Sequence, residues 1–291
     1  MKPYLYLFFV VFIFLSTGCK SHQNPYENSS GRVSSVSESS KSSEVIYSEE
    51  FLNPFSQLVY KNECASDPRK LTHWNKGEDF PSLGLGHFIW LREGDKKERF
   101  VQSFPALVQY MVDKGVDVPL WLRAERSPWQ NSFEFQKEKT QGAARMMELQ
   151  NLLLSTFSYQ AKHIVDKGWN TIQQYRNSSE PTIAELFRWG VRRMETSTRG
   201  LMLMLDYGNF KGFGVSEKER VAGQGWGMLQ VFENMKRMAP DSEPVCSFAR
   251  SAMYVLDRRI RNEVRENAAS PAPRWRLGWK NRLERSSGCS I

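Results

Sequence analysis

One stretch of the chain gathers side chains that could together cleave a glycosidic bond. Glu63 ends an apolar segment, Glu78 and Asp79 follow in a polar turn, and Ser82 and His87 flank a Gly-x-Gly turn. Glycosidic cleavage needs a carboxylic acid that protonates the leaving oxygen, and a second polar group that holds water or stabilises the oxocarbenium ion. The two glycines would let the backbone approach a bulky sugar. The pattern therefore predicts Glu63 as the general acid and Glu78 or Asp79, with Ser82, as its partner.

The turn itself resembles a known motif. Ser82-Leu83-Gly84-Leu85-Gly86-His87 is similar to the Thr-x-Gly-x-Gly-His turn of phage-type lysozymes, where a helix ending in the catalytic Glu precedes the turn by a similar distance. The resemblance implies that Glu63 corresponds to that Glu, Ser82 to the Thr beside the attacking water, and His87 to a mainly structural His. The family has an Asp where this chain has Lys76, so the identity of the second carboxylate stays open between Glu78 and Asp79.

A second, glycine-rich segment looks like part of another lysozyme-like family. Gly223-Gln224-Gly225-Trp226-Gly227-Met228-Leu229-Gln230 resembles the Gly-Leu-Met-Gln segment that lines the sugar cleft of lytic transglycosylases, with its middle residues swapped. Glu217 and Glu219 lie too close to the segment to match that family's Glu. The resemblance therefore implies that Gln224, Trp226 and Gln230 are cleft-wall residues that bind substrate, as Asp79 and His87 would.

Each of these residues also has a structural interpretation. Glu63 could pair with one of the many basic side chains, since perturbed acids and structural ion pairs look alike in sequence. Glu78 and Asp79 could be loop or N-cap residues, and Ser82 could be an ordinary turn residue. His87 could be a hydrogen-bonded structural histidine, and the sequence does not choose between these interpretations and the catalytic ones.

The N-terminus predicts export. Lys2 precedes an apolar run over 4–15, which is shorter than the roughly 20 residues of a membrane span and is typical of a signal peptide. The run ends in Leu15-Ser16-Thr17-Gly18-Cys19, which resembles a bacterial lipobox. The resemblance implies cleavage before Cys19, acylation of Cys19 with chains such as palmitate, and anchoring in a membrane. Because Lys20 rather than Asp follows, the outer membrane facing the periplasm is expected; the alternative is an ordinary secretory signal.

Composition and charge restrict the class of partner. The chain has 291 residues, of which 40% are hydrophobic and 25% charged, so simple disorder is excluded for most of it. The net charge of +8 favours polyanions, and export makes nucleic acid an unsuitable partner. The candidate partners that remain are anionic lipid and peptidoglycan, or another anionic glycan of the envelope. The sequence does not predict the oligomeric state.

Cysteine spacing and the absence of other motifs exclude several cofactors. Once Cys19 is lipidated, Cys64, Cys246 and Cys289 permit one disulfide and leave one thiol, with three pairings open. The chain has no Cys-x-x-Cys or His-x-x-x-His spacing, phosphate loop or dinucleotide fingerprint, so we expect no metal and no cofactor.

The rest of the chain reads as one helical domain. We expect a signal peptide over 1–18, a lipidated Ser-rich tether over 19–48, a mainly α, single lysozyme-like domain over 49–270 and a basic tail over 271–291 that could dock its two Trp. A short irregular or β-hairpin segment is expected near residues 70–90. Thr182 is expected to cap a helix, with Glu185 completing a capping box. The other expected helices cover 54–64, 105–114, 141–167, 199–207 (buried), 225–238 and 247–265.

Three functional hypotheses follow. The first is a lipid-anchored hydrolase of the muramidase type that cleaves peptidoglycan strands, with transglycosylation as the variant chemistry. The second is a non-catalytic lipoprotein that binds glycan or protein on a lysozyme-like fold, which the Lys76 departure favours. The third is an effector or secretion-apparatus lipoprotein.

Overall fold

The computed structural model describes residues 46–75, 77–94, 101–238 and 243–291. The predicted signal peptide, Cys19, nearly all of the tether, and Lys76 lie outside these ranges. The described part is mainly α-helical with small antiparallel sheets, which confirms the predicted mainly α class. None of its helices combines the length and apolar character that crossing a membrane requires.

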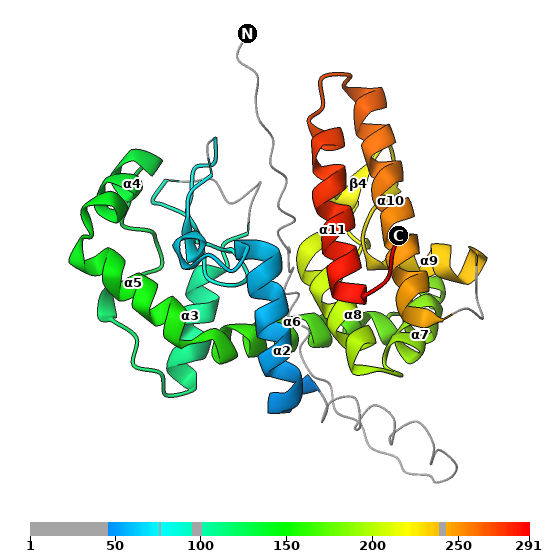
Figure 1. Ribbon diagram of the computed structural model, residues 1–291, viewed down its shortest axis with the longest axis horizontal. Coiled ribbons are helices and arrows are strands. Elements are labelled where there is room, and N and C mark those ends of the chain that lie inside the picture. Colours follow the sequence, from blue (N-terminus) through cyan, green and yellow to red (C-terminus); the bar gives the residue numbers. More distant parts are fainter. Residues whose placement is uncertain (1–45, 76, 95–100, 239–242) are drawn as a thin grey trace, which may run out of the picture.

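The helices form two groups that two further helices connect (Figure 1). The first group contains α3 (Phe104–Asp113), α4 (Ser132–Gln141), α5 (Ala144–Ser155) and a small sheet. The second contains α7 (Pro181–Met194), α8 (Thr198–Lys211), α9 (Met228–Met238), α10 (Pro244–Glu266) and α11 (Arg276–Ser287). The long helix α6 (Phe157–Arg176) contacts both groups, and α2 (Glu49–Cys64) packs on α6 and α8.

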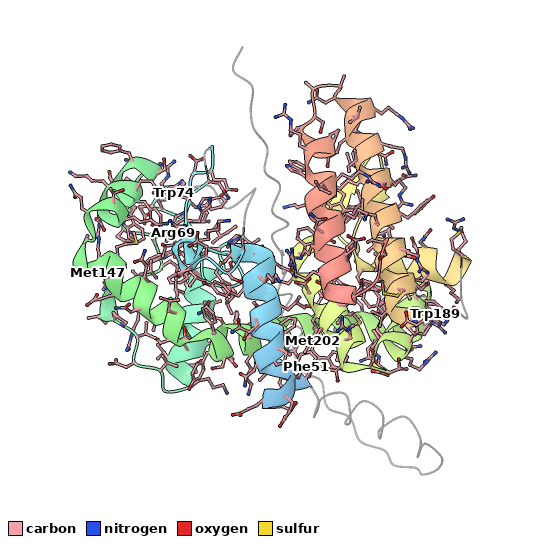
Figure 2. All side chains as sticks on the ribbon, viewed as in Figure 1. Phe51, Arg69, Trp74, Met147, Trp189 and Met202 are labelled. Atoms are coloured by element: carbon pink, nitrogen blue, oxygen red, sulfur yellow. A yellow bond between two sulfur atoms is a disulfide. The ribbon has the colours of Figure 1, made fainter. Side chains whose placement is uncertain are left out.

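Short elements complete the chain. They are the 3-10 helices η1 (Pro68–Leu71), η2 (Leu120–Arg123), η3 (Glu217–Glu219) and η4 (Ala272–Trp275), and the strands β1 (Thr72–His73), β2 (Ser82–Leu83), β3 (Phe88–Ile89), β4 (Arg220–Val221) and β5 (Gln224–Gly225). Figure 2 shows side chains filling the interior of both groups, with Trp74 in the first and Met202 toward the second. Most of the buried hydrophobic side chains form one continuous core.

The hairpin expected near residues 70–90 is present. Strands β1, β2 and β3 pair antiparallel, with Leu83 opposite Phe88. The turn between β2 and β3 is held against α6, because the backbone N–H of Leu85 donates to Oε1 of Gln160 at 2.8 Å. Gly84 has a φ of 70°, and a Cβ there would lie 2.4 Å from the same Oε1. The glycine is therefore required by both conformation and space.

The expected single helix over 141–167 is wrong, because two helices occupy this range and the second extends beyond it. Helix α5 ends at Ser155, and the buried Thr156 separates it from α6, which continues to Arg176. The hydroxyl of Thr156 donates to the carbonyl of Leu152 at 2.6 Å, which satisfies that carbonyl at the helix end. Both helices bury their apolar side chains in the same core, so the hydrophobic pattern continues across the break.

The predicted start of α7 is wrong as well. Pro181 occupies the first turn and Glu180 precedes it as the N-cap, so Thr182 lies inside the helix. Proline is favourable there because its fixed φ suits the helix and its missing N–H is not needed. Glu185 pairs with Lys236 of α9 at 2.5 Å instead of completing a capping box.

Other boundaries follow the predictions more closely. Helix α8 is buried along most of its length, as expected for 199–207. Helix α2 begins at Glu49 rather than Pro54, because the hydroxyl of Ser48 caps it by accepting from the N–H of Phe51 at 3.3 Å. Both helices contribute to the site described below.

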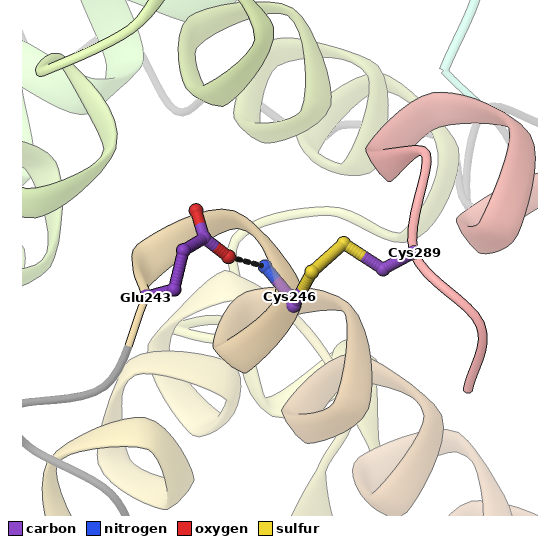
Figure 3. Close-up of side chains that lie close together, drawn as sticks. All are labelled: Glu243, Cys246 and Cys289. Carbon is purple, nitrogen blue, oxygen red and sulfur yellow. Dashed lines mark hydrogen bonds between the residues drawn. A yellow bond between two sulfur atoms is a disulfide. The ribbon is translucent and has the colours of Figure 1, made fainter.

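The C-terminal segment is part of the fold rather than a separate tail. Helix α11 packs on α8 and α10, and Trp279 is buried. Trp279 belongs to the hydrophobic core and Trp275 packs against it, so the two Trp dock on the domain as the sequence suggested. Cys289, just after α11, forms a disulfide with Cys246 in the first turn of α10 (Figure 3).

Candidate active site

One pocket holds three of the residues that the sequence singled out. Glu63, Ser82 and His87 all line it, at the place where α2, the β2–β3 hairpin, α6 and α8 meet. Its other lining residues are Phe80, Gly86, Phe88, Ile89, Ser103, His163, Ile164, Lys167, Gly168, Asn209, Phe210 and Phe213. The pocket thus combines aromatic rings with hydroxyl, amide and charged groups, as small-molecule sites commonly do.

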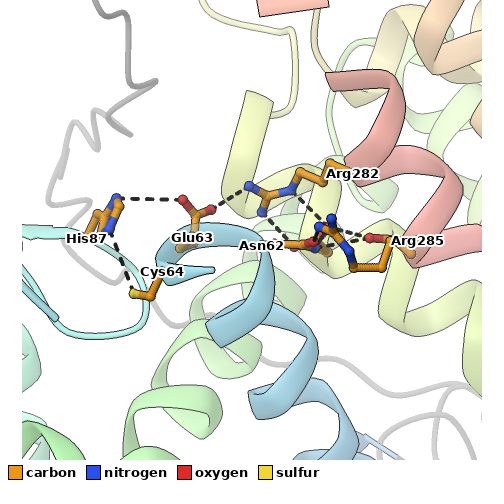
Figure 4. Close-up of polar contacts among 8 residues, drawn as sticks. Asn62, Glu63, Cys64, His87, Arg282 and Arg285 are labelled. Atoms are coloured by element: carbon orange, nitrogen blue, oxygen red, sulfur yellow. Dashed lines mark hydrogen bonds and ion pairs between the residues drawn. The ribbon is translucent and has the colours of Figure 1, made fainter. Parts of the chain in front are cut away.

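Glu63 is set in place by the end of its helix and by two basic side chains. It lies in the last turn of α2, which Ala65 terminates in the left-handed conformation. Only 7% of its side chain is exposed. Its Oε1 accepts from Nη1 of Arg282 at 2.7 Å, and its Oε2 lies 3.6 Å from Nδ1 of His87 (Figure 4). Glu63 is thus an ion-paired carboxylate at the pocket wall.

Arg282 is itself held by Asp206, a buried carboxylate of α8. The guanidinium donates to both oxygens of Asp206, from Nη2 at 2.6 Å and from Nε at 3.1 Å. Asp206 also accepts from Nδ2 of Asn62 and from the hydroxyl of Ser286, each at 3.0 Å. This ion network, Glu63–Arg282–Asp206, connects α2, α8 and α11 and satisfies its buried charges with hydrogen bonds, as buried charges require.

The network determines the charge of Glu63. Burial by itself would raise the pKa of Glu63, but the charges of Arg282 and His87 and the Arg282 hydrogen bond outweigh it and hold the pKa below its ordinary value. Glu63 is therefore ionised at neutral pH. Burial also lowers the pKa of His87, against the opposing effect of the Glu63 charge.

His87 also contacts Cys64, which raises the question of cysteine catalysis. Nε2 of His87 lies 4.0 Å from Sγ of Cys64, so the His87 ring lies between Cys64 and Glu63 (Figure 4). However, Cys64 is fully buried and does not line the pocket. Burial raises its pKa to about 12, so the thiol does not ionise at neutral pH. Because the thiolate is the nucleophile, this arrangement is structural.

Ser82 reaches the pocket from the middle strand of the sheet. It pairs with His73 of β1 and Ile89 of β3, and only 3% of the residue is exposed. The pairing fixes the backbone of Ser82 on the same wall as Glu63, the placement that the hairpin pattern predicted.

Glu78 is connected to the pocket wall through Asn75 and His73. It is not among the residues that line the pocket. Its Oε2 accepts from Nδ2 of Asn75 at 3.0 Å, and Oδ1 of Asn75 lies 2.7 Å from Nε2 of His73, the partner of Ser82 in the sheet. Burial raises the pKa of Glu78 to about 7, with the Asn75 hydrogen bond opposing it. Glu78 therefore changes charge near neutral pH.

The other acidic candidate, Asp79, faces solvent. Its side chain is 75% exposed and lies 3.3 Å from Nη2 of Arg92. Of the two candidates for the second carboxylate, Glu78 is the one that hydrogen bonds connect toward the strand of Ser82, through Asn75 and His73.

The three residues expected in the cleft wall do not line this pocket. Gln230 is buried, accepts from the N–H of Gly227 at 3.1 Å and donates to the carbonyl of Gly214 at 3.0 Å. Trp226 is buried, with Arg259 3.9 Å from its ring centroid. Gln224 is exposed and accepts from Nδ2 of Asn262 at 2.9 Å. Trp226 and Gln230 thus hold a glycine-rich segment together, which corrects their expected position.

Several site residues had no motif in the sequence. Asp206 and Arg282 come from segments that read as a core helix and a basic tail, and their pairing spans a separation of 76 residues. His163 and Lys167 share a face of α6 by their spacing of four, which periodicity alone could have shown. Nothing in the sequence signalled that this face would border Glu63.

One cluster of acidic and cysteine side chains has the spacing of a metal site but does not form one. Among the described residues, Glu243, Cys246 and Cys289 form such a cluster. The two sulfur atoms are joined in the disulfide, so they offer no thiolate to an ion (Figure 3).

Comparison with protein families, with curated proteins and with solved structures gave no match for this chain.

Proposed function

We propose that this protein is a lipid-anchored envelope enzyme of lysozyme-like fold that cleaves the glycan strands of peptidoglycan, with Glu63 as its general acid. One observation carries the proposal: Glu63, Ser82 and His87, which the sequence pattern grouped, line one pocket. Acidic, hydroxyl and aromatic groups in one pocket are the components that glycosidic cleavage uses.

Glu63 must carry a proton when the leaving oxygen departs. In the free protein Arg282 and His87 favour its ionised form. A sugar that fills the pocket would remove the remaining water from the 7% of the Glu63 side chain that is exposed, and further desolvation favours the protonated form of a carboxyl group. Substrate binding would therefore raise the pKa of Glu63 toward the range of a general acid. The leaving oxygen takes the Glu63 proton as the glycosidic C–O bond breaks, and a water beside Ser82 adds to the anomeric carbon. That water loses one of its protons to solvent, from which the Glu63 carboxylate is protonated again.

Ser82 and Glu78 have different parts in this scheme. Ser82 lines the pocket and would hold the attacking water. Glu78 would act as a positioning residue, since it reaches Ser82's strand only through Asn75 and His73. Hydrolysis is preferred to transglycosylation because the Ser82 turn resembles that of the hydrolases.

The expected location fits this substrate. Lipidated Cys19 would anchor the chain in the bacterial envelope, on the periplasmic side of the outer membrane, and the tether would let the domain reach the wall. Residues 181–291 carry 19 Lys and Arg against 12 Asp and Glu. The second helix group is thus the basic part of the molecule and would be attracted to an anionic glycan.

A non-catalytic glycan-binding lipoprotein is the second candidate function. The specific observation that favours it is the Glu63–Arg282 ion pair, since an ionised carboxylate has no proton to donate. Both candidates use the same pocket, so the measurement of cleavage separates them.

The test is incubation of residues 20–291 with purified sacculi, beside Glu63→Gln and a control, Glu217→Gln. Glu217 is 89% exposed and outside the pocket, so its variant should match the parent. Muropeptides with reducing ends, released by the parent and by Glu217→Gln only, would support the muramidase. Anhydro products would mean a transglycosylase. Sacculus binding without release would favour the second candidate, and full activity in Glu63→Gln would exclude Glu63 as the acid.

A further inference from the structure

The outer face of α10 carries a row of arginines. Arg250, Arg261 and Arg265 are all exposed, and Tyr254, which is 45% exposed, lies between the first two in the chain. Successive spacings of four, seven and four residues place these four side chains on one face of a helix. At the ordinary rise of a helix the row is about 22 Å long. We call these four residues the α10 stripe.

Helix α10 leaves the α10 stripe on the outside of the molecule. The helix packs between α9 and α11 and also contacts α8 (Figure 1). The faces that make these contacts bury apolar side chains, among them Phe248, Val255 and Leu256. The stripe thus faces solvent along four turns of a helix that is otherwise well packed.

The arginines of the stripe have no acidic partner among the described residues. The acids of the same helix bind other groups. Asp257 pairs with an arginine of α11 at 2.7 Å, and Glu263 pairs with the buried Arg259 at 2.7 Å. Glu266 accepts from the backbone N–H of Ala222 at 3.0 Å. The positive charge of the stripe is therefore not balanced by the helix that carries it.

We propose that the α10 stripe is the surface with which the folded domain contacts an anionic phospholipid membrane. A guanidinium group matches a phosphate group with two parallel hydrogen bonds, so a row of arginines suits a layer of lipid phosphates. A tyrosine ring, apolar along its body and polar at its tip, suits the headgroup level. The inference goes beyond the proposed cleavage, because the stripe shares no residue with the pocket.

A membrane fits the stripe better than a glycan strand does. The stripe lies on the convex side of a helix, where a flat surface can meet it without a groove, whereas sites for small ligands are concave. The anchor expected at Cys19 also keeps lipid close to the domain. Cys19 precedes Ile46 by 27 residues, and a chain of that length reaches at most about 95 Å.

The test is sedimentation with vesicles at low ionic strength, using residues 20–291, which are the predicted mature chain without its lipidated cysteine. One set of vesicles contains phosphatidylcholine and phosphatidylglycerol in equal parts, and the other contains phosphatidylcholine alone. The parent is compared with a stripe variant and a control variant. The stripe variant carries Arg250→Gln, Arg261→Gln and Arg265→Gln.

The control variant removes the same charge from another part of the surface. It carries Lys61→Gln, Lys70→Gln and Lys137→Gln, which replace exposed lysines of α2, η1 and α4. A further variant with Arg250→Lys, Arg261→Lys and Arg265→Lys keeps the charge of the stripe. It separates the loss of charge from any effect of the substitutions on folding.

We expect the parent to bind the vesicles that contain phosphatidylglycerol and not those of phosphatidylcholine alone. Each arginine near an anionic surface strengthens binding by about fivefold, so the stripe variant should bind about a hundredfold more weakly. The control variant and the lysine variant should keep most of the affinity. Raising the salt concentration should weaken binding by the parent, because salt screens exposed charges.

Three results would overturn the proposal. The first is failure of the parent to bind vesicles with phosphatidylglycerol, and the second is equal weakening in the stripe and control variants. The third comes from sedimentation with purified sacculi: loss of sacculus binding in the stripe variant, with vesicle binding unchanged, would assign the stripe to the anionic glycan. Release of muropeptides depends on the pocket, so the cleavage assay tests the proposed function separately.

Discussion

Glu63 in the last turn of α2 and Arg282 in α11 form an ion pair of 2.7 Å between residues separated by 219 positions in the chain. The pair joins the start of the described domain to its end, beside the pocket. Because Arg282 also binds Asp206, one guanidinium pairs with two buried carboxylates, and its removal would take an ion-pair partner from both.

The first prediction concerns this guanidinium. Arg282→Met should reduce the free energy of unfolding at pH 7 by about 3 to 5 kcal/mol, since breaking a buried pair leaves uncompensated charge. Arg285→Met is the matched control, because Arg285 is exposed and donates to Oδ1 of Asn62 at the edge of the network. Urea unfolding of the two variants beside the parent would measure the difference. Equal stability of Arg282→Met and the parent would show that the network does not stabilise the fold.

The second prediction concerns the pH dependence of cleavage. A general acid is active in its protonated form, and Arg282 and His87 lower the pKa of Glu63 in the free protein. The kcat/KM should therefore fall as pH rises above this lowered pKa. Arg282→Gln should raise the pKa of Glu63 and move that fall to higher pH. A pH–rate profile of both proteins would test this, and an unmoved profile would mean that another group limits the rate.

The third prediction concerns Glu78 and stability. Its pKa is about 7 in the folded chain and ordinary in the unfolded chain, so the folded state binds the extra proton between about pH 4.5 and 7. Stability that comes from the protonated form is complete below the unfolded pKa and is lost as pH rises through 7. Glu78→Gln should thus be more stable than the parent at pH 8, by up to about 3 kcal/mol for the full pKa difference.

The control for Glu78 is pH itself. At pH 4 the parent carries a protonated Glu78, so the same substitution should change the unfolding midpoint little. Asp79→Asn should show no comparable gain at pH 8, because Asp79 is mostly exposed and pairs with Arg92. A Glu78→Gln gain that is independent of pH would contradict the raised pKa.

The fourth prediction concerns the segment that holds Gln230. A Cβ at Gly227 would lie 2.0 Å from the backbone N and 2.5 Å from the Cα of Gly214. Because these are backbone atoms, no change of side-chain rotamer can relieve the clash. Gly227→Ala should therefore destabilise the fold by about 3 kcal/mol or more through overpacking. Gly278→Ala in α11 meets no atom within 4 Å and should instead stabilise its helix slightly. Thermal unfolding of both variants gives the comparison, and a mild effect at Gly227 would show that the segment is loosely packed.

The sequence predicted the parts of the site that depend on local signals. The order of an apolar helix, its terminal Glu63 and the Ser82 hairpin follows from periodicity and turn residues, and the structure places these residues in one pocket. Prediction from the sequence failed where the packing of helices against one another determines the structure. The break at Thr156 is hidden because α5 and α6 bury their apolar faces in the same core. Hydrophobic periodicity shows which side chains are buried and does not show where one helix ends and the next begins.

Long-range partners had no signal at all. Asp206 resembles any acid in a core helix, and Arg282 is one of many basic residues near the C-terminus. Their pairing depends on how α8 and α11 pack, which no spacing encodes. The same reason explains why Gln230 and Trp226 were wrongly predicted to line a cleft. Their segment resembles a cleft motif, but Gln230 binds neighbouring backbone and Trp226 packs against Arg259.

The last prediction concerns the disulfide that follows α11. Cys246 and Cys289 are separated by 43 residues in the chain, and closing a loop of that size stabilises a fold by about 4 kcal/mol in the chain-entropy model. The double variant Cys246→Ser, Cys289→Ser should lose stability of that order. Because Cys289 follows the helix that carries Arg282, loosening α11 should also weaken the hold on Glu63. The fall of kcat/KM with rising pH should then move to higher pH in the double variant, as in Arg282→Gln. Dithiothreitol supplies the control: it should destabilise the parent and leave the double variant unchanged, whereas an equal effect on both would mean that the bond does not fasten α11.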